Sequence, residues 1–334
     1  MIPVFVPNYY SDFRCIAAAC KHSCCIGWEI DVDKDALDRY DRVEGALGKR
    51  LKASIDREAD PPCFKLTSDE RCPFLNENGL CDLITELGED SLCHICADHP
   101  RFRNVMNDRV ELGLGLCCEA AATLILSRNE PFAVVELSPA SAVRERYAHG
   151  DPEPPDEASA ELLALRSALL EILQNRTRPL SDRIRHVFFD MDINLTENIS
   201  EVFMSYPRIA ALLKSMERLD PAWDACLDAL ETLPEDPLYE LDGEDSVAFE
   251  NLLCYFLYRY LAAEDDGYGV AYTGRVRVLL SVLCTVIIHA IHRATGGKDL
   301  DSLCEISRMF SSEIEYSEEN MERLTEAAGE GFID

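Results

Sequence analysis

Basic residues are scarce in this sequence. It contains 32 Lys and Arg residues against 62 Asp and Glu residues, which gives a formal net charge of −30. Such a surface repels the phosphate groups of nucleic acids and of anionic membranes, so we expect neither as a partner. The same charge attracts a cationic partner, for instance a lysine-bearing protein, and it also keeps an acidic protein dispersed in solution.

A secretory leader and a long hydrophobic run are also missing. The first residues, Met1–Pro7, contain no basic leader and no small-residue cleavage site. The most apolar segment, Val278–Ile291, spans about 14 residues, whereas a bilayer span needs roughly 20. We therefore expect a cytoplasmic protein in which Val278–Ile291 is a central core helix. Cytoplasmic thiols stay reduced, so the 15 cysteines are expected to be metal ligands or redox groups rather than disulfides.

The common sequence patterns of metal and nucleotide sites are absent as well. Zinc fingers carry two Cys-x2-Cys knuckles, and only Cys93-His-Ile-Cys96 has this spacing. A Cys-x3-Cys-x2-Cys loop fails because Gly27 stands where the third cysteine would be. The segment Gly113-Leu-Gly-Leu116 is too short for the Gly-x-Gly-x-x-Gly turn of a dinucleotide site.

What the sequence does contain is a concentration of thiols near its start. Four cysteines lie in apolar, helix-like segments and are expected to pack in the core: Cys226, Cys254, Cys284 and Cys304. The other eleven fall within the first 118 residues: Cys15, Cys20, Cys24, Cys25, Cys63, Cys72, Cys81, Cys93, Cys96, Cys117 and Cys118. Thiolates suit zinc or the iron of iron–sulfur clusters rather than magnesium or calcium. The residues alone thus predict a thiolate-rich metal site on a helical scaffold.

The chain is predicted to be mainly α-helical and to have two domains. The segment 149–158, rich in Pro and acidic residues, predicts a linker between a cysteine-rich metal-binding domain at 1–148 and a larger acidic helical domain at 159–334 packed with it. Apolar residues at helical spacing predict the individual helices, at Asp33–Leu51, Cys117–Ser127, Leu162–Leu173, Val202–Met216, Leu252–Leu261 and Val278–Ile291.

Six short blocks occur in a characteristic order along the chain. They are Cys24-Cys-Ile-Gly-Trp28, Cys72-Pro-Phe-Leu75, Gly79-Leu-Cys81 followed by Leu87-Gly-Glu89, Cys96-Ala-Asp-His-Pro-Arg101, Cys117-Cys-Glu-Ala-Ala121 and Glu250-Asn-Leu-Leu253. This series resembles the bacterial flagellin lysine-N-methylase (FliB) family, within the wider set of proteins with a cysteine cluster of the CxxCxxCC type. The sequence departs from the family pattern at His99, where Tyr is usual, and at Cys118, where Pro is usual.

The resemblance implies an enzyme that transfers a methyl group from S-adenosylmethionine to lysine Nζ of a protein such as flagellin. It also implies an iron–sulfur cluster, of the [4Fe–4S] type, held by N-terminal cysteines. Eight positions match the family pattern and are the predicted ligands: Cys15, Cys20, Cys24, Cys25, Cys72, Cys81, Cys96 and Cys117. Such a cluster takes four thiolates, so eight ligands mean either two sites or one site with supporting thiols. The roles of Cys63, Cys93 and Cys118 stay open.

Methyl transfer to lysine by direct displacement needs the loss of a proton from an amine with an ordinary pKa of about 10.4. By residue type and by their place in the matching blocks, the predicted catalytic residues are Glu119, Glu250 and Tyr255, and the residues predicted to meet a carboxylate of the cofactor are Arg101 and Arg259. The alternative function is a zinc-structured cysteine-cluster protein that acts as a binding module, with the acidic helical domain docking a basic partner, or as a metal or redox carrier.

Overall fold

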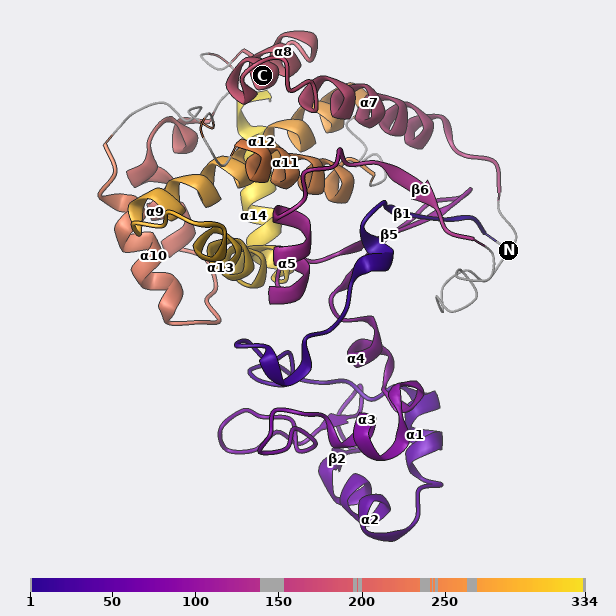
Figure 1. The fold of residues 1–334 in the computed structure, drawn as a ribbon. Coiled ribbons are helices and arrows are strands. Elements are labelled where there is room, and N and C mark those ends of the chain that lie inside the picture. Colours follow the sequence, from indigo (N-terminus) through magenta and orange to yellow (C-terminus); the bar gives the residue numbers. More distant parts are fainter. Residues whose placement is uncertain are drawn as a thin grey trace. The chain divides into compact units, whose positions relative to one another are not determined.

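The computed structural model describes residues 2–138, 153–194, 197, 200–234, 241, 243, 246–262 and 269–332. The fold is mainly α-helical, as predicted, with 56% helix and 9% strand. The chain forms two compact units (Figure 1). The larger unit comprises Met1–Phe13, Arg103–Cys117 and Ala121–Asp334, and the smaller unit comprises Arg14–Phe102 and Cys118–Ala120.

The predicted linker at 149–158 stays a prediction. Its residues 149–152 lie outside the described residues. The cysteine-rich segment that precedes it contributes to both units, because residues 103–117 and the segment from 121 onward group with the C-terminal helices. The smaller unit is therefore an insertion in the chain of the larger one rather than an N-terminal half.

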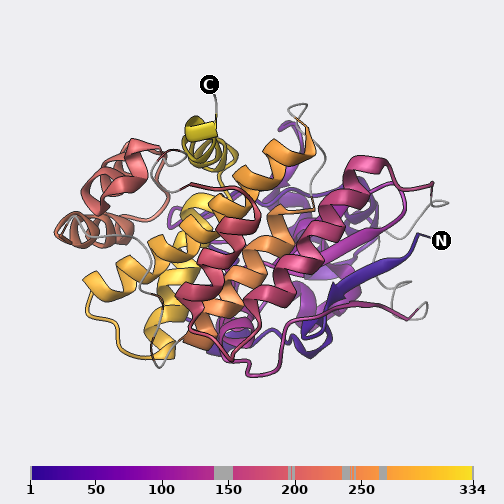
Figure 2. The same ribbon diagram turned by 90° about the horizontal axis from the view of Figure 1, so that it is seen from above.

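Helices make up most of the larger unit. Three of them lie side by side (Figure 2): α7 (Glu157–Leu173), α11 (Ser246–Tyr260) and α12 (Val270–Ala294). The others are α5 (Glu119–Leu126), which begins in the smaller unit, α8 (Leu180–Asp190), α9 (Tyr206–Lys214), α10 (Ala222–Glu231), α13 (Leu300–Phe310) and α14 (Glu318–Gly329). Short turns complete it: η1 (Tyr10–Asp12), η4 (Glu201–Met204), the π-helical η5 (Ser311–Glu315) and η6 (Glu330–Phe332). The four cysteines predicted to pack in the core are all buried here.

Helix α12 is a buried core helix, as predicted, but it is longer than the apolar run indicated. It begins at Val270 and spans 25 residues, because the segment 270–277, in which polar and apolar residues are mixed, belongs to the same helix. Length and composition alone would let it cross a membrane, yet 83% of its most apolar 18-residue window is buried inside the protein. Burial, and not shortness, therefore identifies it as the central helix of the core.

The predicted helix at Val202–Met216 is interrupted in the structure. Its first turn is the 3-10 turn η4, and α9 starts afresh at Tyr206. Ser205 between them is extended, with φ −154° and ψ 148°. Pro207 follows in the first turn of α9, the place where a residue without an N–H donor is tolerated.

A four-stranded sheet, which the helical pattern did not indicate, adjoins these helices in the larger unit. Its order is β4 (Arg101–Val105), β5 (Val110–Leu114), β1 (Val4–Pro7) and β6 (Val134–Glu136). The first two residues of β4 are grouped with the smaller unit. Strand β1 is parallel to β5, with Val4 opposite Val110, and antiparallel to β6. Alternating β-branched residues such as Val4 and Val6 are buried and favour the extended conformation.

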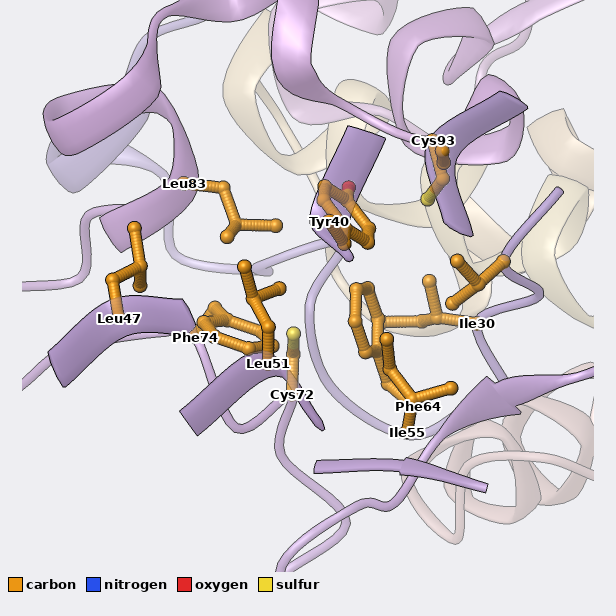
Figure 3. Close-up of a cluster of buried hydrophobic side chains, with 12 residues drawn as sticks. Ile30, Tyr40, Leu47, Leu51, Ile55, Phe64, Cys72, Phe74, Leu83 and Cys93 are labelled. Atoms are coloured by element: carbon orange, nitrogen blue, oxygen red, sulfur yellow. The ribbon is translucent and has the colours of Figure 1, made fainter. Parts of the chain in front are cut away.

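The smaller unit has short elements around a core of its own. They are η2 (Ala17–Ala19), α1 (Lys34–Tyr40), α2 (Gly45–Ser54), β2 (Ile55–Asp56), β3 (Cys63–Phe64), α3 (Asp82–Leu87), η3 (Glu89–Ser91) and α4 (His94–Asp98). Buried aromatic and aliphatic side chains meet in its centre, among them Tyr40, Leu51, Phe64 and Phe74 (Figure 3).

The predicted helix at Asp33–Leu51 is two helices. Asp33 caps α1 by accepting a hydrogen bond from the Ala36 N–H at 2.9 Å. The chain then leaves the helical path at 41–44, and α2 begins at Gly45, whose φ of +75° disfavours a side chain. The break turns α2 so that Leu47 and Leu51 face the core.

Gly48 offers a test of this break. An added Cβ at Gly48 would overlap the carbonyl group of Val43. Alanine normally stabilises a helix interior by about 1 kcal/mol relative to glycine. Because the backbone must shift here, we expect Gly48→Ala instead to lower the free energy of unfolding by about 1–3 kcal/mol in urea titrations. The exposed Lys49→Ala should change it by less than about 0.5 kcal/mol, and a stabilised Gly48→Ala would contradict the close approach.

Candidate metal centre and predicted catalytic residues

Five thiols lie in or against the core of the smaller unit, and we call them the inner thiol set. Cys72 and Cys93 are buried in this core (Figure 3), and three partly buried cysteines pack against it: Cys25, Cys81 and Cys96. Local structure holds them there. The Cys72 N–H donates to the Cys25 carbonyl at 2.8 Å, Cys81 immediately precedes α3, and Cys93 immediately precedes α4.

The inner thiols interact electrostatically. Burial raises the pKa of Cys72 to about 12, and the charges of Cys25, Cys81 and Cys93 contribute to the rise. The hydrogen bond between Cys93 and Cys96 lowers the pKa of Cys93 and raises that of Cys96. Gathering several thiolates in one core is unfavourable by itself, and a bound cation would reverse this by stabilising the deprotonated forms.

Four further cysteines of the smaller unit form a more exposed group, which we call the outer thiol set. Cys15 and Cys24 are exposed, and Cys20 and Cys118 are partly exposed. Cys24 connects the two sets, because its hydrogen bond with Cys25 lowers the pKa of Cys25 to about 7 and raises that of Cys24. The structure thus places seven of the eight predicted ligands in the smaller unit.

The eighth predicted ligand, Cys117, belongs to the larger unit. There it hydrogen-bonds to the phenol of Tyr316, and its charge contributes to raising the pKa of that phenol, for which burial is the main cause. The boundary between the two units falls directly after Cys117, so the adjacent thiols of Cys117 and Cys118 belong to different units.

The spacing of the thiols bears on which metal they fit. In a tetrahedral zinc site with Zn–S bonds of about 2.3 Å, the sulfurs lie about 3.8 Å apart. Within the described residues, the only three Cys, His, Asp or Glu side chains whose ligand atoms all lie within 4.8 Å of one another are Asp33, Asp35 and His94. Among the described residues, no three thiols are therefore spaced as in a tetrahedral zinc site.

The Asp33 group itself is explained by helix capping. One Asp33 carboxylate oxygen caps α1, and the other accepts from the His94 N–H at the start of α4 at 2.6 Å. The His94 ring lies 3.7 Å from the same carboxylate. This carboxylate holds two helix starts together.

Among the predicted catalytic residues, Glu250 is enclosed by two arginines. Its side chain is 1% exposed and lies 2.6 Å from Arg183 and 2.9 Å from Arg176. These ion pairs tie α11 to α8 and to the segment before it. The catalytic role of Glu250 stays a prediction, and the geometry favours a structural one.

Tyr255 and Arg259 are brought together by a buried carboxylate that sequence reasoning missed, Glu315. The Tyr255 hydroxyl lies 3.0 Å from one Glu315 oxygen, and the Tyr260 hydroxyl donates to Glu315 at 2.8 Å. Arg259 pairs with Glu315 at 3.1 Å and donates to the Tyr255 hydroxyl at 2.9 Å. Glu315 ends the π-helical turn η5, a kind of distortion that is frequent at functional sites.

Glu119 and Arg101 both belong to the smaller unit. The Glu119 carboxylate is partly exposed and accepts a hydrogen bond from the Lys21 N–H at 2.8 Å. Arg101 donates to the Ala97 carbonyl at 3.3 Å. Glu250 is held in ion pairs and Tyr255 is buried. Of the three predicted acid–base residues, Glu119 is therefore the one with a partly exposed side chain.

The larger unit also has a polar cleft of about 340 Å³ at the starts of α8 and α11. Arg176, Arg178 and Arg183 line it together with Thr177 and Ser246. Two of these arginines are the partners of Glu250, and Arg178 is exposed. Cationic side chains beside two helix N-termini favour an anionic group such as a carboxylate or phosphate.

These features describe a helical protein with an inserted, thiol-rich unit, and part of the chain is similar to known proteins. Over an aligned stretch of 144 residues, the chain is 29% identical to the flagellar biosynthetic protein FliU of Salmonella muenchen. This stretch covers 40% of this chain and 83% of FliU. The chain is equally similar over 144 residues to the lysine-N-methylases of Salmonella choleraesuis and Salmonella typhimurium. The match spans only 35% of the length of those two enzymes. No family model and no solved structure matches the chain.

Proposed function

We propose that this protein is a lysine N-methyltransferase whose smaller unit holds a cysteine-ligated metal centre. The observation that carries the proposal is the similarity to two lysine-N-methylases together with the inner thiol set. The name of the flagellar biosynthetic protein FliU supports flagellin as the kind of protein substrate. S-adenosylmethionine is the methyl donor that the family resemblance implies. The negative charge of the chain suits a lysine-bearing partner.

The metal centre would be held by the inner thiol set. Cys25, Cys72, Cys81 and Cys96 are four of the predicted ligands, and Cys93 is a fifth thiol in the same core. The donor set suits zinc or the iron of an iron–sulfur cluster. A bound cluster supplies electron transfer.

Glu119 is the residue that we propose accepts the proton of the lysine amine. Its carboxylate is partly exposed, whereas Glu250 is held between arginines and Tyr255 is 1% exposed. Arg259 is committed to Glu315, whereas the exposed Arg178 lines a cleft of the larger unit that suits the carboxylate of the cofactor. The volume of this cleft lies within the range of ligand sites.

The test combines metal analysis with a methylation assay. Protein purified without oxygen should contain iron and sulfide, and flagellin co-expressed with it should carry methylated lysines detectable by mass spectrometry. We expect Glu119→Gln to lower methylation by about 100-fold or more, the scale of general acid–base catalysis, at unchanged metal content. The exposed Glu86→Gln on α3 is the matched control. Unchanged methylation in Glu119→Gln would remove Glu119 from the mechanism.

A second function is favoured by the place of the inner thiols in the core of a small unit. A metal bound there stabilises the fold without any reaction, as in structural zinc sites. This protein would then be a binding module or a metal or redox carrier. Stoichiometric zinc, a colourless protein and unmethylated flagellin would support this function over the first.

A further inference from the structure

We propose that the polar cleft at the starts of α8 and α11 is a binding site for the phosphate group of a small ligand. The cleft has a volume of about 340 Å³, and all the residues that line it belong to the larger unit. The inference goes beyond the proposed function, because it needs neither the thiols nor methyl transfer. The carboxylate proposed for the cofactor would use the same donors, so the two ligands would compete for the cleft.

Cationic side chains are concentrated at this cleft in a chain that has few of them. The sequence contains 32 basic residues against 62 acidic ones, yet three arginines line the cleft: Arg176, Arg178 and Arg183. Glu250 lies 2.9 Å from Arg176 and 2.6 Å from Arg183. Within the described part of the chain, Arg178 has no ion pair. Three guanidinium groups are thus balanced by a single carboxylate.

Arg183 carries a buried donor that the described residues leave unused. Its Nη1 donates to the Glu250 carboxylate at 2.6 Å and to the Leu173 carbonyl. Its Nε is buried and has no hydrogen-bond partner among the described residues. In a guanidinium group, Nε shares an edge with Nη2, and Arg176 binds Glu250 through this edge. Because Arg183 lines the cleft, an oxyanion bound there would supply the missing acceptor.

Two helix starts add backbone donors to the same cleft. Helix α8 has 11 residues and begins at Leu180, and α11 has 15 residues and begins at Ser246. Both of these residues line the cleft. The N-cap position of α8 is Pro179, which has no side-chain acceptor to cap the helix. The first N–H groups of a helix lack intrahelical acceptors and carry partial positive charge, so they favour an anion.

The charge of the cleft favours a phosphate over a carboxylate. A phosphate monoester has a charge of about −1.5 to −2 at neutral pH and three strong acceptor oxygens, whereas a carboxylate has one charge and two oxygens. Three arginines and one glutamate leave two positive charges to be balanced. The volume of the cleft suits a small ligand, and Pro179, Leu180 and Val247 offer apolar surface to the part of the ligand beyond the phosphate.

Titration calorimetry of the full chain with inorganic phosphate tests the site. At constant ionic strength and about pH 8, where phosphate is doubly charged, we expect phosphate to bind at least about 10-fold more tightly than acetate. Arg178→Ala should weaken phosphate binding by about 10-fold or more, because it removes a charge-assisted hydrogen bond. Arg178 is exposed, so this variant should keep its fold, which circular dichroism checks.

Arg185→Ala is the matched control. Arg185 also belongs to α8 and is 63% exposed, but it is not among the residues that line the cleft. We therefore expect this variant to bind phosphate like wild type.

Three results would overturn the inference. Acetate that binds as tightly as phosphate would refute the preference for phosphate. Wild-type protein that does not bind phosphate, or an Arg178→Ala protein that binds it like wild type, would refute the site. Methylated flagellin made by a protein that does not bind phosphate would leave the proposed function standing. Phosphate binding that Arg178→Ala abolishes, in a protein that does not methylate flagellin, would support the site and overturn the proposed enzyme alone.

Discussion

Replacing Glu250 by alanine is expected to lower the free energy of unfolding by about 3–5 kcal/mol. The substitution leaves Arg183, which has a side chain only 5% exposed, buried without the carboxylate that lies 2.6 Å away. It also releases Arg176, which approaches Glu250 at 2.9 Å. The cost is high because removing one member of a buried ion pair leaves an uncompensated charge in a low-dielectric core. Urea titration followed by circular dichroism measures it.

The control for Glu250→Ala is the loss of a solvent-exposed ion pair. Glu201→Ala removes an exposed carboxylate that lies 2.9 Å from Arg208, and surface pairs contribute about 0–1 kcal/mol. A Glu250→Ala protein that unfolds like wild type but has lost methylation would refute the structural role and restore Glu250 as a catalytic residue. Loss of stability at measurable methylation would instead assign Glu250 to the scaffold.

Arg166→Met is the second substitution with a large expected effect, again a loss of about 3–5 kcal/mol. Arg166 of α7 makes two bonds to Glu111 of β5, at 2.6 and 2.7 Å, and the Glu111 side chain is fully buried. The pair joins the sheet to the helices at the one acidic residue of β5. Removing the arginine leaves a carboxylate without a partner in the interior.

Arg166→Met can lower stability either because Glu111 loses its partner or because the packing of the Arg166 side chain is lost. The double variant Glu111→Leu with Arg166→Met distinguishes these two causes. Buried ion pairs replaced by hydrophobic residues of similar size are often neutral or stabilising, so we expect the double variant to recover most of the stability lost in Arg166→Met. A double variant as unstable as the single one would show that Arg166 matters through its contacts with Tyr258, whose ring lies 5.0 Å from the guanidinium carbon.

The helices could be predicted because their signal is local. Apolar residues three and four positions apart indicated α7, α11 and the centre of α12. The sheet could not, because β1 has four residues and its parallel partner β5 lies more than 100 residues later. The first two turns of α12 and the break before Gly45 were missed because both depend on packing and backbone geometry rather than on periodicity.

The candidate site, too, could be predicted only where its signal is local in the sequence. Short blocks of sequence indicated which cysteines to consider, but their division into an inner and an outer set depends on which thiols the fold buries or packs against the core. Glu315 gave no signal, because the tyrosine and the arginine that it binds come about 60 residues earlier. The partners of Glu250 are similarly remote, 67 and 74 residues away.

The insertion of the smaller unit between β1 and β4 has a consequence for synthesis on the ribosome. Strand β1 emerges first, and its partner β5 follows only after about 100 further residues, which takes about 5–20 s at ordinary elongation rates. Residues 14–102, with a hydrophobic centre of their own, leave the exit tunnel complete within that interval. The smaller unit can therefore close its hydrophobic centre, against which the inner thiols pack, before any of the long helices has been translated.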